Sequence, residues 1–582
     1  MNRLLRNLGL TLTTVREHLT DDPALLALQA SRRLPGSLVR PTAALAAAVT
    51  DRAGLPVGAA LSALVLGREV RVQTVLKEAL SDPRTSPARA RALADLALLA
   101  GEADAASGLL ERATGAPRLR GALARRLWHD GEATSAVAVL RGACSSAERS
   151  QRARLEAELR VLNGWRPALL PVRHEAHPRR VLHVLTNSLP HTASGYAQRT
   201  HSLLLAQRAA GWEPLAVTRT GYPVQIGRLK ARQEDTLDGI TYRRVLPARL
   251  EPGLDGRLQQ LAGAVLELAM EFRPAVLHTT THYVNAMVTQ AVAEALGIPW
   301  VYEVRGQLAD TWASSRGPEA RRSERYGLFR EREAEAARAA DLVVTLGHTM
   351  RANLLEQRVP EEKVLVAPNA VGGDFLAEPL SPAQARGRLR MDPDTPLIGT
   401  VSSLVGYEGI DDLVEAFGIL AAKNPRLGLL IVGDGAELPA LRDQVRRTGL
   451  LGRVTFTGRV SREQASLHHQ ALDIFVVPRK DHAVTRDVTP LKPVEAMASA
   501  RPVVASRLPA LEEIVQDGAT GLLTPPEDPE TLASTVGLLL ESGRLRARLG
   551  AAGRAEVLAG RTWTANAEAL VRAYDNLRED TP

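Results

Sequence analysis

The stretch RDVTPLKPVEAMASARPVVAS, residues 486–506, places two carboxylates beside a predicted helix. Asp487 and Glu495 lie eight positions apart in it. We expect EAMASA to be a short helix that runs into the buried strand RPVVAS, with Glu495 in its first turn. The helix dipole favours a carboxylate there, and the carboxylate can accept hydrogen bonds from the vicinal hydroxyls of a sugar. Asp487 is expected to begin the preceding loop and to point into the same opening.

Two cations lie close to these acids in the sequence. Lys492 is in the same stretch, and Arg479 follows the predicted strand DIFVVPR. Pro490 and Pro493 are expected to fix an extended loop between Arg479 and the helix. Lysine and arginine at this position are suited to phosphate groups. A simpler alternative stays open, in which Glu495 only caps its helix and Asp487 only pairs with an arginine.

Strands alternate with helices from residue 179 onwards, which predicts parallel, doubly wound sheets. Ligands bind such sheets outside the carboxyl ends of the strands, so the residues that follow each strand are candidates for a binding site. In the first sheet these are Asn187, His191, Ser194, Gly195, Thr279, Thr280, Thr281, His282, Asn285, Arg305 and Gly306. In the second sheet they are Ser402, Ser403, Gly433, Asp434, Gly435, Gly458, Arg459, Arg479 and Lys480.

The pattern divides the 582 residues into four parts. Residues 1–172 are predicted to be an all-α domain, 178–375 and 390–562 two Rossmann-like α/β domains, and 563–582 a final helix. Residues 375–392 are expected to be a linker between the two α/β domains. The predicted fold class is therefore α/β, with two Rossmann-like domains preceded by a helical domain.

The helical part contains a repeat with a spacing of 30 residues. ALADLALLAGEADAASGLLERA begins at Ala92, and ALARRLWHDGEATSAVAVLRGA begins at Ala122. Each unit predicts two helices joined at a glycine, Gly101 or Gly131, and resembles tetratricopeptide-type hairpins. Residues 59–80 form a weaker third unit, and an ordinary helical bundle is the alternative. Such a domain could recruit a protein partner.

The composition limits the class of protein. The single cysteine excludes an internal disulfide, no apolar run is long enough to span a membrane, and we see no signal peptide, so we expect a cytoplasmic protein. The net charge of +8 comes almost entirely from arginines mixed with acids, which argues against nucleic acid as a partner. The first predicted helix, residues 2–19, carries a leucine stripe and arginines. We therefore keep peripheral attachment to the inner membrane face open beside a capping role.

Other common sites are not indicated. GDGAEL lacks the third glycine of a dinucleotide motif, and no phosphate-binding lysine loop or GxSxG motif is present. His, Cys and acidic residues do not cluster at zinc spacing, so we expect no metal and no cofactor. His278 and His282 are four residues apart across the end of a strand. We expect His282 to contact substrate or to be hydrogen-bonded, not to bind a metal.

Residues 179–582 resemble the GT-B glycosyltransferases of the large retaining group called family 4. The acid-x7-acid signature of that family is matched by Asp487 and Glu495, followed by EAMA and PVVAS. Further matches are LLIVGDG, VTFTGRV, ALEEIVQDGATGLLTPPEDPETLA, PNAV and the closing TW…A…Y helix. The resemblance implies two domains that face each other across a cleft, with the final helix crossing back to the first.

The resemblance also implies roles for individual residues. Glu495 would bind the ribose hydroxyls of a nucleotide, and Asp487 would contact the transferred sugar. The backbone of Thr489 to Leu491 would face sugar and phosphate. Gly195 would let the backbone approach the diphosphate. The remaining substrate-binding candidates are Ser403 and Gly433 at strand ends, and Gly458 and Val460, where the family holds the base.

This chain departs from the family at several positions. Ser403 and Glu408 replace the arginine and lysine that bind phosphate, so we expect Arg479 and Lys492 to supply this charge from elsewhere in the cleft. Arg305 stands where the family has a histidine, and it could add charge from the opposite domain. Pro490 removes one backbone donor.

The sequence therefore predicts an enzyme that moves a sugar from a nucleotide diphosphate sugar to an acceptor hydroxyl. Retention of configuration, and a glycan or lipid-linked acceptor in surface polysaccharide or glycolipid synthesis, are implied by the resemblance. Cations on the leaving diphosphate are expected to carry the catalysis. A nucleotide-sugar epimerase is a rival that the acid-x7-acid form disfavours. The alternative from another class is a non-catalytic scaffold in which helical repeats carry a degenerate transferase.

Overall fold

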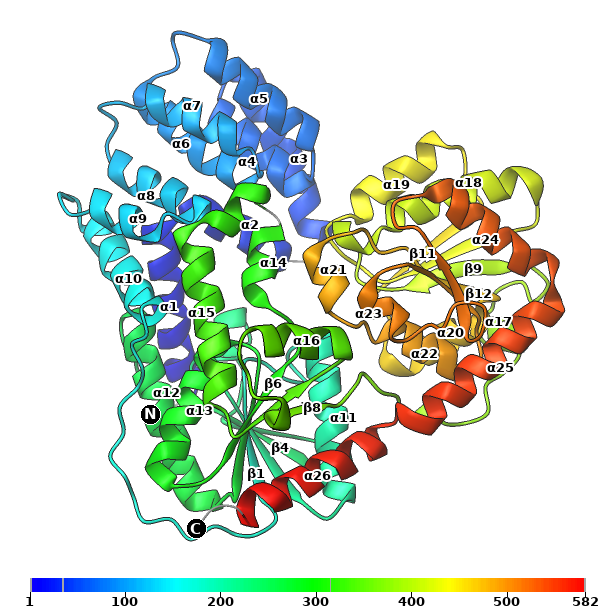
Figure 1. The fold of residues 1–582 in the computed structure, drawn as a ribbon. Coiled ribbons are helices and arrows are strands. Elements are labelled where there is room, and N and C mark those ends of the chain that lie inside the picture. The colour runs from blue at the N-terminus through cyan, green and yellow to red at the C-terminus, as the bar shows by residue number, and fades with distance from the viewer. Residues whose placement is uncertain (1–2, 34–35, 315, 580–582) are drawn as a thin grey trace.

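Two separate sheets form the cores of the second and third parts of the chain, and helices form the first part (Figure 1). Their strands are parallel except for the antiparallel pair β3–β4 at one edge of the first sheet. The computed structural model describes residues 3–33, 36–314 and 316–579. The predicted fold class, two Rossmann-like domains preceded by a helical domain, is confirmed.

Helical hairpins build the N-terminal domain. The two helices of each hairpin meet at a glycine with positive φ: Gly67, Gly101 or Gly131. The predicted 30-residue repeat corresponds to α6–α7 and α8–α9, and its weaker unit to α4–α5. Arg125 forms a bidentate ion pair with Asp95, the residue at the matching position of the preceding repeat. The helices are α1 (Arg3–Asp21), α2 (Pro23–Arg33), α3 (Gly36–Arg52), α4 (Pro56–Leu66), α5 (Glu69–Ser81), α6 (Pro87–Leu99), α7 (Ala103–Arg112), α8 (Leu119–Asp130), α9 (Ala133–Val139) and α10 (Ser146–Leu162).

The helical domain packs on the first α/β domain. Arg325 lies over the rings of Trp128 and Trp312, and its backbone N–H donates to the carbonyl of Gly131. Helix α1 lies against the same α/β domain, because the Asn7 amide donates to the carbonyls of Leu229 and Ala231. The first helix therefore joins two domains and does not simply cap the repeats.

The first sheet has the strand order β3-β4-β2-β1-β5-β6-β7-β8. Alternate residues of β1 enter hydrophobic clusters on opposite faces of the sheet, as in a sheet covered by helices on both sides. Its elements are β1 (Arg180–Leu185), α11 (Gly195–Ala209), β2 (Glu213–Thr218), β3 (Glu234–Leu237), β4 (Ile240–Arg244), α12 (Gly253–Phe272), β5 (Val276–Thr280), α13 (Tyr283–Leu296), β6 (Trp300–Val304), α14 (Leu308–Ser314), α15 (Glu324–Ala339), β7 (Leu342–Thr345), α16 (His348–Glu356) and β8 (Val364–Val366).

The second sheet has the order β11-β10-β9-β12-β13-β14, and every pairing in it is parallel. Its elements are β9 (Leu397–Val401), α18 (Ile410–Lys423), β10 (Gly428–Val432), α19 (Leu438–Arg447), β11 (Val454–Gly458), α20 (Arg462–Ala471), β12 (Ile474–Val477), α21 (Ala483–Asp487), α22 (Lys492–Ala498), β13 (Val503–Ser506), α23 (Pro509–Glu512), β14 (Gly521–Thr524), α24 (Pro529–Glu541) and α25 (Gly543–Gly560).

The prediction that residues 375–392 are a linker is wrong. The segment contains helix α17 (Pro382–Arg388), whose N-terminus has a capping box formed by Ser381 and Gln384. Arg386 is buried and pairs with Asp473 at 2.6 Å, so this segment is packed into the second α/β domain. The loop predicted after Arg479 also differs, since it contains α21, and Pro493 lies in the first turn of α22.

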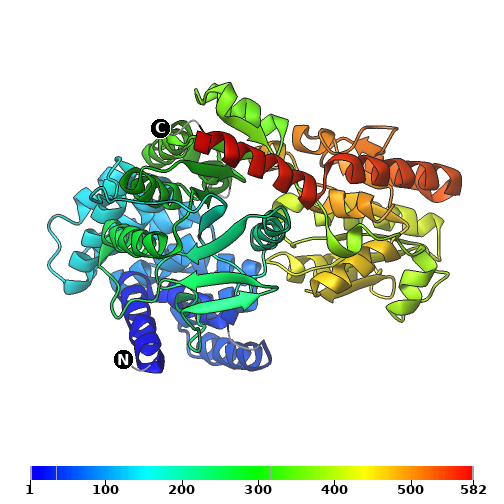
Figure 2. The same cartoon turned by 90° about the horizontal axis from the view of Figure 1, so that it is seen from below.

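The chain crosses between the α/β domains twice, as the resemblance implies. It leaves the first domain after β8, and helix α26 (Trp563–Glu579) returns from the second domain to pack against α11 and the first sheet (Figure 2). The two crossing segments are hydrogen-bonded to each other, because Val371 pairs with Arg561 and Trp563 through the backbone. These crossings set how the two sheets face each other.

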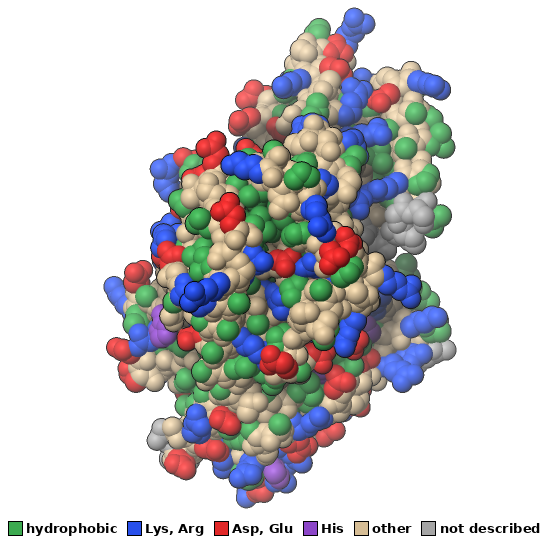
Figure 3. Space-filling model, turned by 90° about the vertical axis from the view of Figure 1, so that its right-hand side faces the viewer, with side chains coloured by type: hydrophobic (Ala, Val, Ile, Leu, Met, Phe, Trp, Pro, Cys, Tyr) green, Lys and Arg blue, Asp and Glu red, His purple; other side chains and the backbone are tan. Residues whose placement is uncertain are grey.

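No helix in the described part of the chain is long and apolar enough to cross a membrane. On the face shown in Figure 3, lysine and arginine side chains are interspersed with aspartate and glutamate. That face has no extended single-sign patch of the kind that nucleic acid requires.

Candidate active site

A cavity of about 590 Å³ lies between the two α/β domains. Both domains line it, and the lining lies beyond the carboxyl ends of the strands in each sheet. Ten of the predicted site residues line this cavity: Gly195, Arg305, Ser403, Gly433, Val460, Arg479, Thr489, Leu491, Lys492 and Glu495. Asp487, Gly458 and His282 are not among the residues that line it.

Glu408 holds the two predicted phosphate-binding cations together. Its carboxylate is buried and accepts from Nη2 and Nε of Arg479 at 3.1 and 3.3 Å. Lys492 Nζ lies 2.7 Å from Glu408 Oε1 and donates to Ser402 Oγ at 2.6 Å. Arg479 also donates to the carbonyl of Val488. Both cations are thereby fixed at one wall of the cavity.

Charge explains why this buried triad is stable. Burial alone would raise the pKa of Glu408, but Arg479 and Lys492 outweigh it and lower this pKa to about 2. The carboxylate is therefore ionised at neutral pH. Burial lowers the pKa of Lys492, and Glu408 opposes that change. With one anion and two cations, the triad presents a net positive charge to the cavity.

Glu495 lies on the same wall, in the first turn of α22, as predicted. The fully buried His469 lies behind it, with Nε2 at 3.5 Å from Glu495 Oε2. The His469 ring stacks on Phe475 and packs edge-on against Phe375. This packing holds the imidazole behind the Glu495 carboxylate, which stays partly exposed.

Two glycines shape the floor of the cavity on the side of the second α/β domain. Gly433 has φ +141°, and a Cβ there would lie 1.7 Å from the carbonyl oxygen of Ser402. Its N–H donates to the carbonyl of Gly458 at 3.0 Å. Gly458 therefore supports the cavity through Gly433 and does not line it.

Asp487 lies at the contact between the domains, at the end of α21, and not in the cavity lining as predicted. Burial and the nearby Asp310 of α14 raise its pKa, and a hydrogen bond with Asn353 of α16 opposes the rise. The short helix α21 turns this side chain toward the first domain. In this structure Asp487 is therefore placed to join the domains.

His282 is also placed away from the cavity. It is the N-cap of α13, where its Nδ1 accepts from the N–H of Val284. The ring stacks on Phe329, with centroids 5.4 Å apart, and burial lowers its pKa to about 4. The geometry gives His282 a structural role and does not support the predicted substrate contact.

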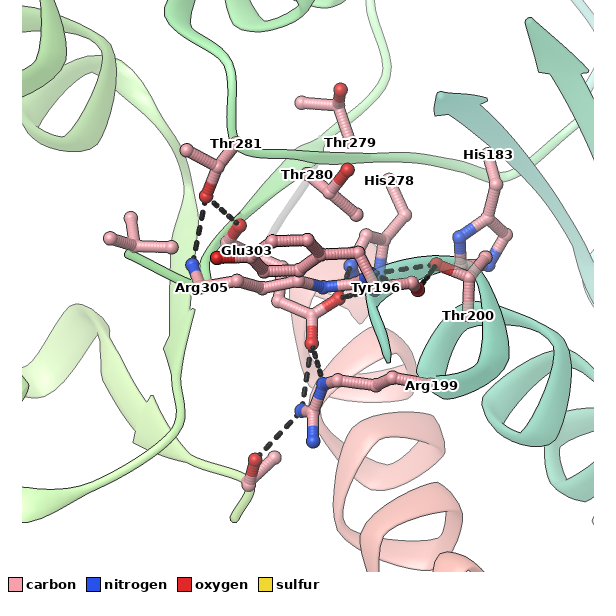
Figure 4. Close-up of polar contacts among 12 residues, drawn as sticks. His183, Tyr196, Arg199, Thr200, His278, Thr279, Thr280, Thr281, Glu303 and Arg305 are labelled. Carbon is pink, nitrogen blue, oxygen red and sulfur yellow. Dashed lines mark hydrogen bonds and ion pairs between the residues drawn. The ribbon is translucent and has the colours of Figure 1, made fainter. Parts of the chain in front are cut away.

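Arg305 reaches the cavity from the opposite wall, where it is part of a buried network (Figure 4). One carboxylate oxygen of Glu303 pairs with Arg305 and the other with Arg199. Arg305 Nη1 donates to Thr200 Oγ1 at 2.7 Å. These two guanidiniums outweigh burial and hold the pKa of Glu303 well below its usual range. Each wall of the cavity thus carries one buried glutamate with two cations.

Thr489 joins the walls at the back of the cavity. It is buried, and its carbonyl accepts from the side-chain amide of Asn369 at 2.8 Å. Its hydroxyl donates to the carbonyl of Leu346 in the first domain. The backbone of the acid-x7-acid stretch is therefore anchored to the first domain.

The sequence did not predict several residues that line the cavity. Tyr196 is half-exposed in the first turn of α11, and its hydroxyl lies 3.3 Å from the position that a Cβ at Gly306 would take. Arg199 and Trp563 also line the cavity, from α11 and α26. Tyr196 follows Gly195 directly, so the strand-end rule could have found it. Trp563 could not have been found in this way, since it comes from the last helix.

Within the described ranges, no group of three or more His, Cys, Asp or Glu side chains is arranged to hold a metal ion. One wall of the cavity carries Arg479 and Lys492, both held by Glu408. The geometry is thus suited to an anionic ligand flanked by a carboxylate that can accept from hydroxyl groups.

Two family models match the α/β domains. Residues 383–556 match the model described as Glycosyl transferases group 1, and residues 194–370 match the Glycosyl transferase 4-like domain. D-inositol 3-phosphate glycosyltransferase of Frankia alni is 30% identical over 311 residues, which is 51% of this chain and 73% of that protein. The chain belongs to the group 1 glycosyltransferases.

Other relatives share shorter segments with this group 1 chain. A GDP-mannose-dependent alpha-(1-6)-phosphatidylinositol monomannoside mannosyltransferase of Mycolicibacterium smegmatis is 31% identical over 243 residues. The match covers 41% of this chain and 63% of the mannosyltransferase, so the chain spans somewhat less than two thirds of that relative's length.

Solved structures share the fold of the group 1 chain. Sucrose-phosphate synthase from Thermosynechococcus elongatus has a TM-score of 0.57 at 22% identity, covering 69% of this chain and 99% of the synthase. Anabaena HepE in complex with UDP and glucose has a TM-score of 0.53 at 18% identity, covering 68% of this chain and all of that structure. Together with the two facing sheets, these likenesses confirm the GT-B architecture.

Proposed function

We propose that the cavity transfers a sugar from a nucleotide diphosphate sugar to an acceptor hydroxyl. The observation that carries this proposal is the Glu408 triad, which fixes Arg479 and Lys492 on the wall that also holds Glu495. Cations and a carboxylate beside one another suit a ligand that carries both phosphates and sugar hydroxyls.

The proposed chemistry depends on the leaving group. As the bond from the sugar to the diphosphate breaks, negative charge grows on the diphosphate and positive charge on the sugar. Arg479 and Lys492 stabilise the diphosphate, and they need no reorganisation because Glu408 already holds them. Glu495 binds the ribose hydroxyls. This arrangement supplies positive charge without a metal, so the proposed reaction is metal-independent, and activity should persist in EDTA.

Retention of configuration is part of the proposal. It is supported by membership of a group in which retention is typical and by the match of Asp487 and Glu495 to the acid-x7-acid signature. The anomeric coupling constant of the product, measured by NMR, tests it. A product whose anomeric configuration is opposite to that of the donor would contradict retention.

The identity of the donor is guided by the relatives. The mannosyltransferase of Mycolicibacterium smegmatis is named as GDP-mannose-dependent, and HepE was crystallised with UDP and glucose. We therefore propose a hexose donor on GDP or UDP, with a glycan or lipid-linked acceptor hydroxyl. The acceptors would belong to surface polysaccharide or glycolipid synthesis.

Peripheral attachment to a membrane belongs to the same proposal. Leu8, Leu12 and Leu19 of α1 are between 44% and 67% exposed, and their spacing places them on one side of the helix. Asn7 and Leu10 hold the opposite side against the first α/β domain. Leu8→Ser combined with Leu12→Ser should abolish co-sedimentation with anionic vesicles and leave donor turnover on a soluble acceptor unchanged.

A donor screen tests the proposed function. Purified protein is mixed with UDP-, GDP-, ADP- and TDP-sugars, with and without candidate acceptors, and release of the nucleotide diphosphate is followed. Glu495→Ala should abolish release, whereas Glu512→Ala, a change at an exposed glutamate, should not. If no donor releases its nucleotide diphosphate although nucleotide still binds, the result would favour the alternative function. That alternative is a non-catalytic scaffold that binds protein partners through its helical hairpins.

A further inference from the structure

Glu303 is a buried carboxylate that the proposed sugar transfer does not use directly. It lies in β6, is 0% exposed, and is placed between Arg199 and Arg305 (Figure 4). Removing a carboxylate from water is unfavourable unless cations and hydrogen bonds compensate for the loss. One arginine pairs with each carboxylate oxygen of Glu303 and compensates for the loss of water. The two arginines make their other contacts in different parts of the molecule.

Arg199 contacts the two segments of the chain that cross between the α/β domains. Its Nη2 donates to the carbonyl of Ala367 at 2.8 Å, and its Nη1 donates to the carbonyl of Pro368 at 3.0 Å and to Asn369 Oδ1 at 3.3 Å. Its guanidinium lies 5.4 Å from the ring centroid of Trp563, at the start of the returning helix. Arg199 therefore contacts both crossing segments, and its N–H groups are committed to protein acceptors.

Arg305 lies at the wall of the cavity. Its Nη1 donates to the carbonyl of Tyr196 and to Thr200, both in the first turns of α11, and its Nη2 pairs with Glu303. Its Nε is buried and has no hydrogen-bond partner among the described residues. Arg305 also lines the cavity, so its positive charge lies at the wall where an anionic ligand would bind.

The returning helix also contacts the far side of Glu303. The Tyr574 hydroxyl of α26 is hydrogen-bonded to His278 and to Gln207. His278 Nε2 lies 3.5 Å from Glu303 Oε2. Three separate contacts with the crossing segments therefore converge on the carboxylate that holds Arg305.

We propose that Glu303 is a positioning residue that couples the crossings between the domains to Arg305. When the crossings hold Arg199 in place, Glu303 keeps the Arg305 guanidinium at the cavity wall, where it meets the anionic group of a bound substrate. A change in domain closure moves Arg199, and through Glu303 it moves Arg305. This inference rests on the proposed function, because it assigns Arg305 to the anion that the reaction places in the cavity.

Hydrogen–deuterium exchange with nucleotide diphosphate provides a test that does not need turnover. In the wild type, bound nucleotide should protect the amides of residues 367–371 and 561–566 as well as those around Glu495. In Glu303→Gln the protection around Glu495 should persist, while protection of the crossings should be lost. Equal protection of the crossings in both proteins would overturn the proposal.

Kinetics provide the second measurement. Glu303→Gln should lower kcat by more than about tenfold while the nucleotide diphosphate Kd changes by less than about threefold. Adding Arg305→Gln should cause no further loss of kcat, because Glu303 acts through Arg305. Additive losses, or an equal loss of binding and turnover, would assign Glu303 a merely structural role and overturn the proposal.

Two further variants keep the test decisive. If Glu303→Gln does not fold, Glu303→Asp can replace it, because aspartate retains the charge but is too short to reach both arginines. Glu303→Asp should show the same large loss of kcat with little change in the nucleotide diphosphate Kd. Glu333→Gln is the matched control, because Glu333 is another buried glutamate of this domain that accepts from the N–H of Leu308 and Ala309 and does not contact Arg305. A wild type that turns over no donor would contradict the proposed function, and the exchange result would still decide the coupling.

Discussion

Lys492 Nζ lies 2.7 Å from Glu408 Oε1, and the same carboxylate accepts two hydrogen bonds from Arg479. Glu408 stands at a position where the family resemblance implies a phosphate-binding cation. In this chain the cations beside that position are Arg479 and Lys492, which both pair with Glu408. Glu408 is therefore the group that holds these two cations at the cavity wall.

Glu408→Gln should destabilise the second α/β domain. Two buried cations would then lie side by side without a counterion, and breaking a buried pair in this way costs about 3–5 kcal/mol. A bound diphosphate would supply the missing negative charge, so saturating nucleotide diphosphate should raise the melting temperature more in Glu408→Gln than in the wild type. Differential scanning fluorimetry measures both shifts. Equal ligand-induced shifts would show that the diphosphate does not meet this triad.

Gly433→Ala should disrupt the floor of the cavity. The added Cβ would lie 1.7 Å from the Ser402 carbonyl oxygen, so the backbone must move, and we expect a loss of about 3 kcal/mol or more in the free energy of unfolding. Gly458→Ala is the matched control, because Gly458 also has positive φ but open space around its Cβ position. It should lose only about 1 kcal/mol. Similar losses in urea titrations of the two variants would contradict this account of Gly433.

His282→Asn should reduce the sensitivity of the fold to acid. The pKa of His282 is about 4 in the folded chain and near 6.5 when unfolded, so the unfolded state binds the proton first. Stability is therefore full above pH 6.5 and falls as the pH drops toward 4, by up to about 3 kcal/mol from this group. Asparagine retains the helix cap without a titrating ring. Urea titrations at pH 7.5 and 5 should show a smaller difference for the variant, with donor turnover unchanged at neutral pH. The same difference as in the wild type would show that His282 does not cause this pH dependence.

Local patterns in the sequence predict most of the fold and the cavity. Alternating strands and helices give the sheets, and the strand-end rule finds Gly195, Arg305 and Gly433 because parallel strands bring their carboxyl ends to one edge. The β3–β4 hairpin does not follow from this alternation, because its two strands are antiparallel and no helix separates them. Its only local signal is the turn at Asp238 and Gly239, which both have positive φ.

The differences between the predicted and the observed positions at the site come from side-chain direction and from distant contacts. Asp487 and His282 lie at the predicted chain positions, but α21 and the start of α13 turn them away from the cavity. Spacing along the chain does not fix such directions. Glu408 and Lys492 are 84 positions apart, so only the tertiary fold brings the counterion to its cation. The contacts of Arg199 with the crossings have the same long-range origin.

The most direct test compares the turnover of the active donor by the wild type, Lys492→Ala and Lys480→Ala. Both lysines belong to the same domain, but Lys480 pairs with Asp411 and is not among the residues that line the cavity. Lys492→Ala should lower kcat about a hundredfold, a loss of about 3 kcal/mol of transition-state stabilisation, and Lys480→Ala should leave kcat nearly unchanged. Full turnover by Lys492→Ala would contradict the claim that this lysine and Arg479 bind the leaving diphosphate.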